Sequence, residues 1–471
     1  MPTPSTFRLT TAATSLACAL LLTGPALAEQ DLAFDGSKVR VNLSNKLNML
    51  GQQISAASCA MKAGINPYVS MTALDRAKTD FDTIMAGLKS GDPALGIPTG
   101  EQRSNVLKAL ASVDKAWAPI RAAAEQMIAQ ENIAPAAQVI ADGNMELLER
   151  TGILAFDVLN TYANPHEMTQ SDALALNFSG RQRMLTYQIA KTACGIKTDV
   201  AAFGTQEDLS KHMQMYELSL TALREGMDAV GINPPPNDLV AGELSNVADD
   251  WAVAKPALAT IVQSGSAEPA DLIAFNGKVD GLVKDMNNVV TLYMLAAPES
   301  EQVYKLPLQA YARDELSKWL TDPQLIEAVK AQNLRHASLS QADVDQLDLD
   351  WRAQAKNGGG PLIDKLLSGP ASEALLGRQN ATAGFVTEVF AMDNKGLNVA
   401  QSVETSDYWQ GDEAKWKQTF GDGSGATHIS EVEYDDSTGA YQTQVSLPLR
   451  DPTTGELIGA ITFGINVQSL L

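Results

Sequence analysis

Two stretches of the chain share one pattern: NLSNKLNMLGQQISAASC at residues 42–59 and NFSGRQRMLTYQIAKTAC at residues 177–194. Both begin with Asn and carry Ser at the third position. Both place Met-Leu at the eighth and ninth positions, and both end in Cys. Apolar residues return every three or four positions, which is typical of an amphipathic helix. The chain therefore contains the same helix twice, each time with a cysteine at the same position.

The repeat extends well beyond these helices. The two helices lie 135 residues apart, and further pairs of similar residues have the same separation. After a one-residue gap, two tryptophans lie 134 residues apart. These pairs are Lys62 and Lys197, Phe81 and Tyr216, Leu88 and Leu223, Gly91 and Gly226, and Trp117 and Trp251. A period this long indicates a duplicated domain rather than a solenoid. We assign the copies to residues 29–164 and 165–298.

Each copy is expected to be a helical bundle. Segments such as 102–130 are rich in Ala, Leu, Lys and Glu, with apolar residues at helical spacing. Gly and Pro punctuate the chain at GDPALGIPTG (91–100) and GINPPPND (231–238). Three or four long helices per copy predict an up-and-down bundle.

The first 28 residues read as a secretory signal. Arg8 precedes an apolar run that ends in Ala-Leu-Ala, so we expect cleavage after Ala28; an uncleaved anchor is the alternative. The net charge of −21 argues against binding nucleic acid or anionic lipid. No later segment has 18 uninterrupted apolar residues. These features predict an exported, soluble, periplasmic protein.

Removal of the signal takes away Cys18 and leaves Cys59 and Cys194. An oxidising compartment favours a disulfide between them, and two buried free thiols are the alternative. A disulfide needs Cα atoms within about 7 Å. It would therefore hold the two helices side by side, parallel, and related by an internal two-fold axis. Residues Asn48 and Arg183 would then face each other about 16 Å from the sulfur atoms.

The second of these helices resembles a known domain. NFSGRQRMLTYQIAK (177–191) resembles the first helix of the N-terminal domain of type IV pilus methyl-accepting chemotaxis transducers (PilJ-type), and is similar to the ligand box of nitrate/nitrite sensor kinases. The resemblance implies that Arg183-Met184 lies at a seam and that Arg183 binds an anion. In the first copy the pair is Asn48-Met49, without the arginine. We expect Asn48, Gln52 and Tyr187 to complete the site. The alternative is that Arg183 pairs with an acid or is solvated.

The last third of the chain, residues 299–471, changes pattern. A long helix, broken near Asp322-Pro323, is expected over 309–333, followed by an antiparallel sheet. Five strands are predicted, at 385–393, 397–403, 428–435, 440–451 and 455–467. VFAMDNKGLNVAQS and VSLPLRDPTTGELIGAITFGINV resemble the Cache/PDC (extracellular PAS-like) sensor domains. The fold class is therefore α+β multidomain: two tandem helical bundles, then a PAS-like antiparallel sheet with a long leading helix.

The Cache resemblance implies a pocket between the sheet and the segment that crosses it. That segment is TSDYWQGDEAKWKQTF (405–420). Its candidate ligand-binding residues are Asp407, Tyr408, Trp409, Asp412 and Trp416. Aromatic walls with a few polar groups suit a small organic ligand, and the carboxylates favour an amine or cation. The alternative is that the tryptophans pack the segment onto the sheet.

Nothing in the sequence indicates catalysis. The four histidines lack metal-ligand spacing, and no nucleophile-elbow, phosphate-loop or dinucleotide motif occurs. We expect no enzyme activity, no cofactor and no metal. The leading hypothesis is a sensory or ligand-binding protein that recognises small molecules and signals through a membrane chemoreceptor or sensor kinase. The alternatives are a non-sensing adaptor or scaffold, and a solute-capture protein.

Overall fold

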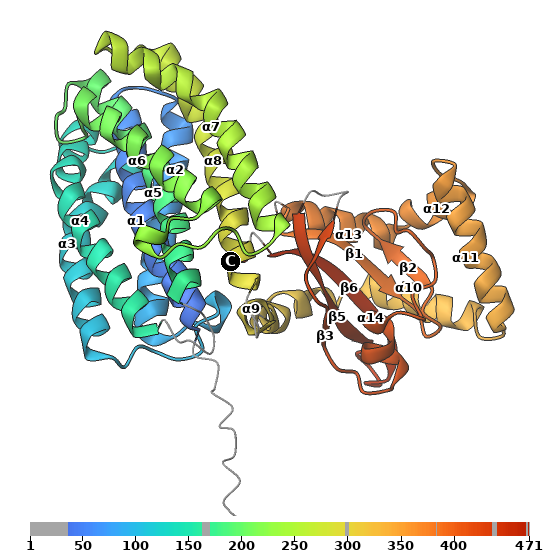
Figure 1. Cartoon of the computed structure of the whole chain (residues 1–471). Coiled ribbons are helices and arrows are strands. Elements are labelled where there is room, and N and C mark those ends of the chain that lie inside the picture. The colour runs from blue at the N-terminus through green and yellow to red at the C-terminus, as the bar shows by residue number, and fades with distance from the viewer. Residues whose placement is uncertain are drawn as a thin grey trace, which may run out of the picture. The chain divides into compact units, whose positions relative to one another are not determined.

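The computed structural model describes residues 36–162, 170–296, 301–382, 384–435, 440–467 and 470 (Figure 1). The predicted signal segment and the predicted boundaries near residues 164 and 298 lie outside these residues. In the described part of the chain, no helix combines the length and the apolar character needed to span a membrane. Long helices come first and an antiparallel sheet follows, which confirms the predicted α+β class.

Each copy of the repeat contains four long helices and one short 3₁₀ turn. The first copy contains α1 (Ser37–Lys62), α2 (Pro67–Ser90), η1 (Pro93–Leu95), α3 (Ser104–Ile128) and α4 (Ile133–Tyr162). The second contains α5 (Gln170–Thr198), α6 (Gln206–Glu225), η2 (Asp228–Val230), α7 (Asp238–Ser264) and α8 (Pro269–Leu295). In each copy every helix packs on the next, and the fourth packs on the first. Each copy is therefore an up-and-down four-helix bundle, as predicted.

Local sequence signals set the ends of these helices. Pro67 occupies the first turn of α2, where its missing N–H is not needed. Thr205 and Asp208 form a reciprocal capping box at the start of α6. The second helix of each bundle ends at a glycine, Gly91 or Gly226, and both have φ of 80°. A side chain would be strained in that conformation, so the glycine stops the helix at the same point in both copies.

The packing repeats as closely as the sequence does. In each bundle a tryptophan of the third helix stacks on an aromatic ring of the second, and its indole N–H donates to the carboxylate next to that ring. These residues are Phe81, Asp82 and Trp117 in the first bundle, and Tyr216, Glu217 and Trp251 in the second. The ring centroids lie 4.3 and 4.2 Å apart, with an interplanar angle of 29° in both. The two copies therefore share the same packing at these positions.

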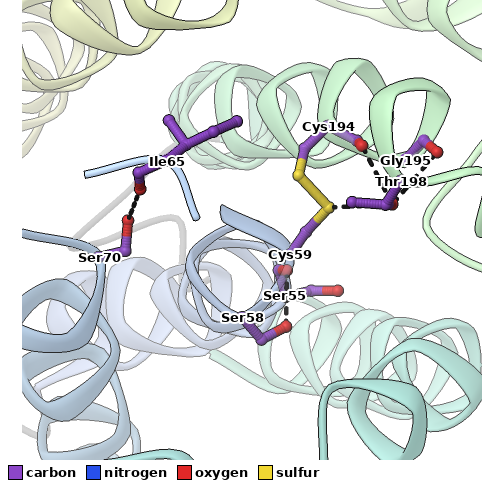
Figure 2. The surroundings of a disulfide bond; sticks show 8 residues. All are labelled: Ser55, Ser58, Cys59, Ile65, Ser70, Cys194, Gly195 and Thr198. Atoms are coloured by element: carbon purple, nitrogen blue, oxygen red, sulfur yellow. Dashed lines mark hydrogen bonds between the residues drawn. A yellow bond between two sulfur atoms is a disulfide. The ribbon is translucent and has the colours of Figure 1, made fainter. Parts of the chain in front are cut away.

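The first helices of the two bundles, α1 and α5, form the seam between them. Cys59 and Cys194 are bonded, with their Cα atoms 6.1 Å apart (Figure 2). Nearer the helix starts, Asn177 Nδ2 donates to Asn45 Oδ1, and Gly180 lies directly against the Asn45 side chain. Contact at both levels shows that the helices run parallel in equal register. The predicted disulfide and the predicted two-fold arrangement are thus present.

The C-terminal region opens with several short helices instead of one long one. They are α9 (Glu301–Asp314), η3 (Leu316–Trp319), α10 (Pro323–Arg335), α11 (Gln341–Lys356), α12 (Pro361–Leu367) and α13 (Pro370–Ala381). The predicted break at Asp322-Pro323 is present, because the Asp322 side chain caps α10. The single helix predicted over 309–333 is otherwise wrong, since a 3₁₀ turn interrupts it after Asp314. Helices α11 to α13 were not predicted.

Within the described residues the sheet has six strands where five were predicted. They are β1 (Val386–Met392), β2 (Asn398–Gln401), β3 (His428–Ile429), β4 (Glu433–Asp435), β5 (Ala440–Arg450) and β6 (Leu457–Asn466), in the order β2-β1-β6-β5-β3, with β4 also paired to β5. All pairings are antiparallel. The predicted strand 428–435 is two strands, because the Ser430 hydroxyl accepts from the backbone N–H of Gln444 and interrupts the ladder.

Two hydrophobic clusters hold the sheet. On one side, β1, β5 and β6 pack with α9, α10 and α13 around residues such as Leu308, Val329 and Phe463. A smaller cluster joins Phe390 and Met392 of β1 to the segment 414–421, which forms α14 (Ala414–Trp416) and the π-helical turn η4 (Lys417–Gly421). The segment predicted to cross the sheet is thus fixed to it by apolar packing.

Candidate functional site at the bundle seam

Arg183 is a buried cation whose partners in the described part of the chain are neutral. Its side chain is 1% exposed. Nη2 donates to Asn42 Oδ1 at 2.7 Å, and Nη1 donates to Asn287 Oδ1 at 2.9 Å. Nε has no hydrogen-bond partner among the described residues. Among the described residues no carboxylate forms an ion pair with Arg183, and burial lowers its pKa to about 10. A buried charge without a counter-ion is costly, so this site favours an anion.

A small cavity of about 240 Å³ lies near Arg183, which is not among its lining residues. Asn42 lines the cavity and accepts a hydrogen bond from Arg183. Lys46 and Arg76 also line it, and Asp80 is an acidic group there. Burial lowers the pKa of Lys46, and Arg183 and Arg76 lower it further, while Asp80 opposes them. Two lining cations with one carboxylate, and the buried charge of Arg183 nearby, make this cavity positive in a chain whose net charge is −21.

The residues predicted to complete the Arg183 site lie in different places in the structure. Asn48 does not bond Arg183; it lines a separate groove, described below. The reason is geometric: side chains tilt toward the helix N-terminus, and the long arginine reaches back to Asn42. Tyr187 is buried and lies within electrostatic range of Arg76 and Asp280; burial raises its pKa.

Gln52 lies in the seam with its side-chain amide unsatisfied by hydrogen bonds from the described residues. It is fully buried, and neither its Nε2 nor its Oε1 has a hydrogen-bond partner in the described part of the chain. Ser55, one turn further along α1, is also fully buried with an unbonded hydroxyl. Unmade hydrogen bonds of this kind cost about 1–3 kcal/mol each. The seam between Arg183 and the disulfide is therefore polar but incompletely satisfied.

Sequence reasoning missed Asn42, Lys46, Arg76, Asp80 and Asn287. The repeat contained a signal for two of them. Asn42 and Lys46 occupy the same positions in the first copy as Asn177 and Arg181 in the second. Arg76 and Asn287 come from α2 and α8, and only the packing of those helices on the seam brings Arg76 to the cavity and Asn287 to Arg183.

The C-terminal candidates are committed to packing. Tyr408 is 4% exposed and stacks on Trp351, with ring centroids 5.3 Å apart. The Trp409 indole donates to the Lys395 carbonyl, and the Trp416 indole donates to the Asp393 carbonyl. Asp407 pairs with Arg352, whereas Asp412 is exposed. These contacts agree with the packing alternative for the tryptophans.

This packing leads to a prediction for Trp409→Ala. The variant loses one hydrogen bond and a half-buried ring. We therefore expect the free energy of unfolding of the C-terminal region to fall by about 1–2 kcal/mol. Chemical denaturation followed by fluorescence measures this change. Asp412→Ala is the matched control from the same segment and should change stability by less than about 0.5 kcal/mol. Equal stability of Trp409→Ala and the parent chain would contradict the packing role.

The fold and the seam define a class: a tandem helical-bundle protein whose halves join as the subunits of a dimer would. Residues 35–142 and residues 167–274 each match the family model described as PilJ, Type IV pili methyl-accepting chemotaxis transducer N-term. No curated protein matches the chain. The predicted PilJ resemblance is thus confirmed in both copies, and it relates the helical region to sensing or signalling. Neither match extends into the sheet. The sheet itself agrees with a Cache/PDC domain only in being antiparallel.

Proposed function

We propose that this chain is a periplasmic sensory protein that binds a small anion at the bundle seam and signals through a membrane chemoreceptor or sensor kinase. The observation that carries the proposal is the buried Arg183 guanidinium, which bonds two amides and pairs with no carboxylate of the described residues. The predicted signal segment and the disulfide support export to an oxidising compartment. We propose no catalytic activity and no cofactor.

The chemistry of the cavity favours a planar oxyanion or a short carboxylate. A guanidinium binds such anions through paired N–H groups. Arg76 lines the cavity, and Arg183, whose Nε is unbonded among the described residues, is linked to it through Asn42. Lys46 adds a second positive charge. A cavity of about 240 Å³ suits a nitrate-sized or acetate-sized ion. Affinity should fall as the pH rises above neutral, because the lowered pKa of Lys46 brings its loss of charge closer to neutral pH.

The seam position explains how binding would become a signal. The cavity is lined by α1 and α2 of the first bundle and by Met294 of α8 in the second, so an anion there contacts both halves. If the ion binds one arrangement of α1 and α5 more tightly, it shifts the population toward that arrangement. The receiving partner would read this change. We further propose that the C-terminal region is a Cache/PDC-like domain that relays the change or recognises a second ligand.

Thermal unfolding of the mature protein with a panel of sodium salts tests this function. The panel is nitrate, nitrite, acetate and succinate, at constant ionic strength with chloride as reference. We expect at least one anion to raise the melting temperature by about 5 °C at saturation. Arg183→Gln should abolish that shift because it removes the buried charge.

Arg181→Gln is the matched control, since it removes a nearby arginine from the same helix. It should leave the shift intact. If no anion stabilises the protein more than chloride does, the anion-sensing proposal is wrong. The adaptor alternative would then be favoured, and the exposed apolar residues Tyr68 and Val69 at the start of α2 would be the first surface to test.

A further inference from the structure

A second and larger groove lies on the seam, separate from the Arg183 cavity. It has a volume of about 810 Å³ and runs between α4 and α5, with further walls from α1 and α6. We call it the α4–α5 groove. Ligand sites for organic molecules typically have volumes of about 300–1,000 Å³. The groove is thus far too large for a nitrate-sized ion and suits a small organic molecule.

The walls of the groove combine apolar side chains with a single charge. Leu148 and Phe156 of α4, Met184 of α5 and Met215 of α6 line it. Phe156 is 62% exposed and Met215 is 37% exposed, so their apolar surfaces are available to a ligand. Arg181 lines the same groove, is exposed, and makes no hydrogen bond or ion pair with any described residue. The groove therefore presents one cation without a described partner, set among apolar side chains and the amides of Asn45, Asn160, Asn177 and Gln188.

A buried polar atom in the groove also points to a ligand. Asn48 lines the groove, and its Oδ1 is shielded from solvent without a hydrogen-bond partner in the described part of the chain. Buried polar groups in proteins nearly always have a partner. Asn48 thus holds an unsatisfied polar atom in the groove wall, and its side chain must turn toward the groove for that atom to contact a ligand.

The internal two-fold axis relates this groove to the anion cavity, but the residues of the two sites differ. Lys46 of the small cavity and Arg181 of the groove occupy equivalent positions in the repeat, as do Asn42 and Asn177. Where the small cavity has the carboxylate of Asp80, however, the groove has Met215 at the equivalent position. The two related sites have therefore diverged, one toward a small polar ion and the other toward an apolar ligand with one negative charge.

From these observations we infer that the α4–α5 groove binds an amphipathic carboxylate, with its head group on Arg181 and its apolar body along Leu148, Phe156 and Met184. Arg181 and Gln188, which also lines the groove, are seven residues apart on α5, a rise of about 10 Å. An extended carboxylate of about ten carbon atoms has a similar length. This site is independent of the proposed anion site at Arg183.

Calorimetric titration of the full mature chain with sodium decanoate, well below its micelle concentration, tests the inference. We expect saturable binding of one decanoate per chain. Arg181→Gln should weaken it by about tenfold or more. Lys46→Gln changes the equivalent residue at the other site and should leave decanoate binding unchanged. Decylamine should bind at least tenfold more weakly than decanoate, because Arg181 repels its charge.

Gly152→Leu gives a second variant that does not depend on charge. Gly152 lies within α4 and lines the groove, and a Cβ added there meets no atom within 4 Å. Leucine should fill the groove and block decanoate, while the better helix former raises the melting temperature. The inference is overturned if the parent chain shows no binding at about 1 mM decanoate, or if Arg181→Gln and Gly152→Leu bind it as the parent does. Nitrate titrations of Arg183→Gln report on the other site, so the two proposals fail separately.

Discussion

Replacing Cys59 and Cys194 together with alanine should lower the stability of the helical region more than any other change considered for the seam. The bond closes a loop of 135 residues between the two bundles. In the chain-entropy model such a loop contributes up to about 5 kcal/mol. For a helical region of this size, that loss lowers the melting temperature by about 10 °C. Alanine is chosen because both cysteines are buried and serine would add an unbonded hydroxyl.

Thermal unfolding followed by circular dichroism at 222 nm measures this loss. The single variants Cys59→Ala and Cys194→Ala are the controls, and each should lose nearly as much as the double variant because either one removes the bond. If the double variant melts with the parent protein, the disulfide does not pin the seam. Alkylation of both thiols in the native protein would lead to the same conclusion.

Gly180→Asn should produce the second large effect, because it places two asparagines opposite each other where α1 and α5 touch at the two-fold axis. Gly180 and Asn45 are equivalent residues of the repeat and face each other across the seam. A Cβ at Gly180 would lie 2.6 Å from the Asn45 Cβ. Overpacking of this kind costs about 3 kcal/mol, and the helices must separate to relieve it. Chemical denaturation of the helical region measures the loss.

The exchange of the two residues is the matched control. The double variant Asn45→Gly/Gly180→Asn restores one asparagine and one glycine at the contact. Its stability should lie within about 1 kcal/mol of the parent, although each single change is destabilising. A double variant that is as unstable as Gly180→Asn alone would show that the two halves are not related by the two-fold axis.

The sequence predicted the seam because a repeated pattern contains long-range information. The equal positions of Cys59 and Cys194 in the two copies predicted a disulfide, and that bond required parallel helices in equal register. The repeat also matched Phe81 with Tyr216 and Trp117 with Trp251. The structure shows that Phe81 stacks on Trp117 in the same way as Tyr216 stacks on Trp251.

The contacts of Arg183 could not be predicted in the same way. The helix face was correct, but the side chain reaches back toward the helix start and bonds Asn42 rather than Asn48. Its second partner, Asn287, belongs to α8, and no pattern within α5 reports which residue of α8 faces it. Lys46 was hidden for another reason. An isolated lysine on a helix reads as solvated, and only burial at the seam makes it part of a site.

In the C-terminal region the strands were predicted more accurately than the helices. Alternating apolar residues defined β1, β5 and β6 to within about two residues at most ends. Helices α11 to α13 are short and rich in polar residues, so their periodicity is weak. Trp351 shows what sequence reasoning could not reach. It is fully buried and stacks on Tyr408 from another segment. Tyr408, which was predicted to line a pocket, is therefore part of a hydrophobic core.

The central claim is that one buried arginine at an internal two-fold seam binds one anion. Calorimetric titration of the best stabilising anion into the parent chain, Arg183→Gln and Arg181→Gln tests it most directly. We predict one site per chain, because the position equivalent to Arg183 in the first copy is Asn48. Arg183→Gln should weaken binding by about tenfold or more, and Arg181→Gln should leave it unchanged. Two sites per chain, or equal affinity in Arg183→Gln, would contradict the claim.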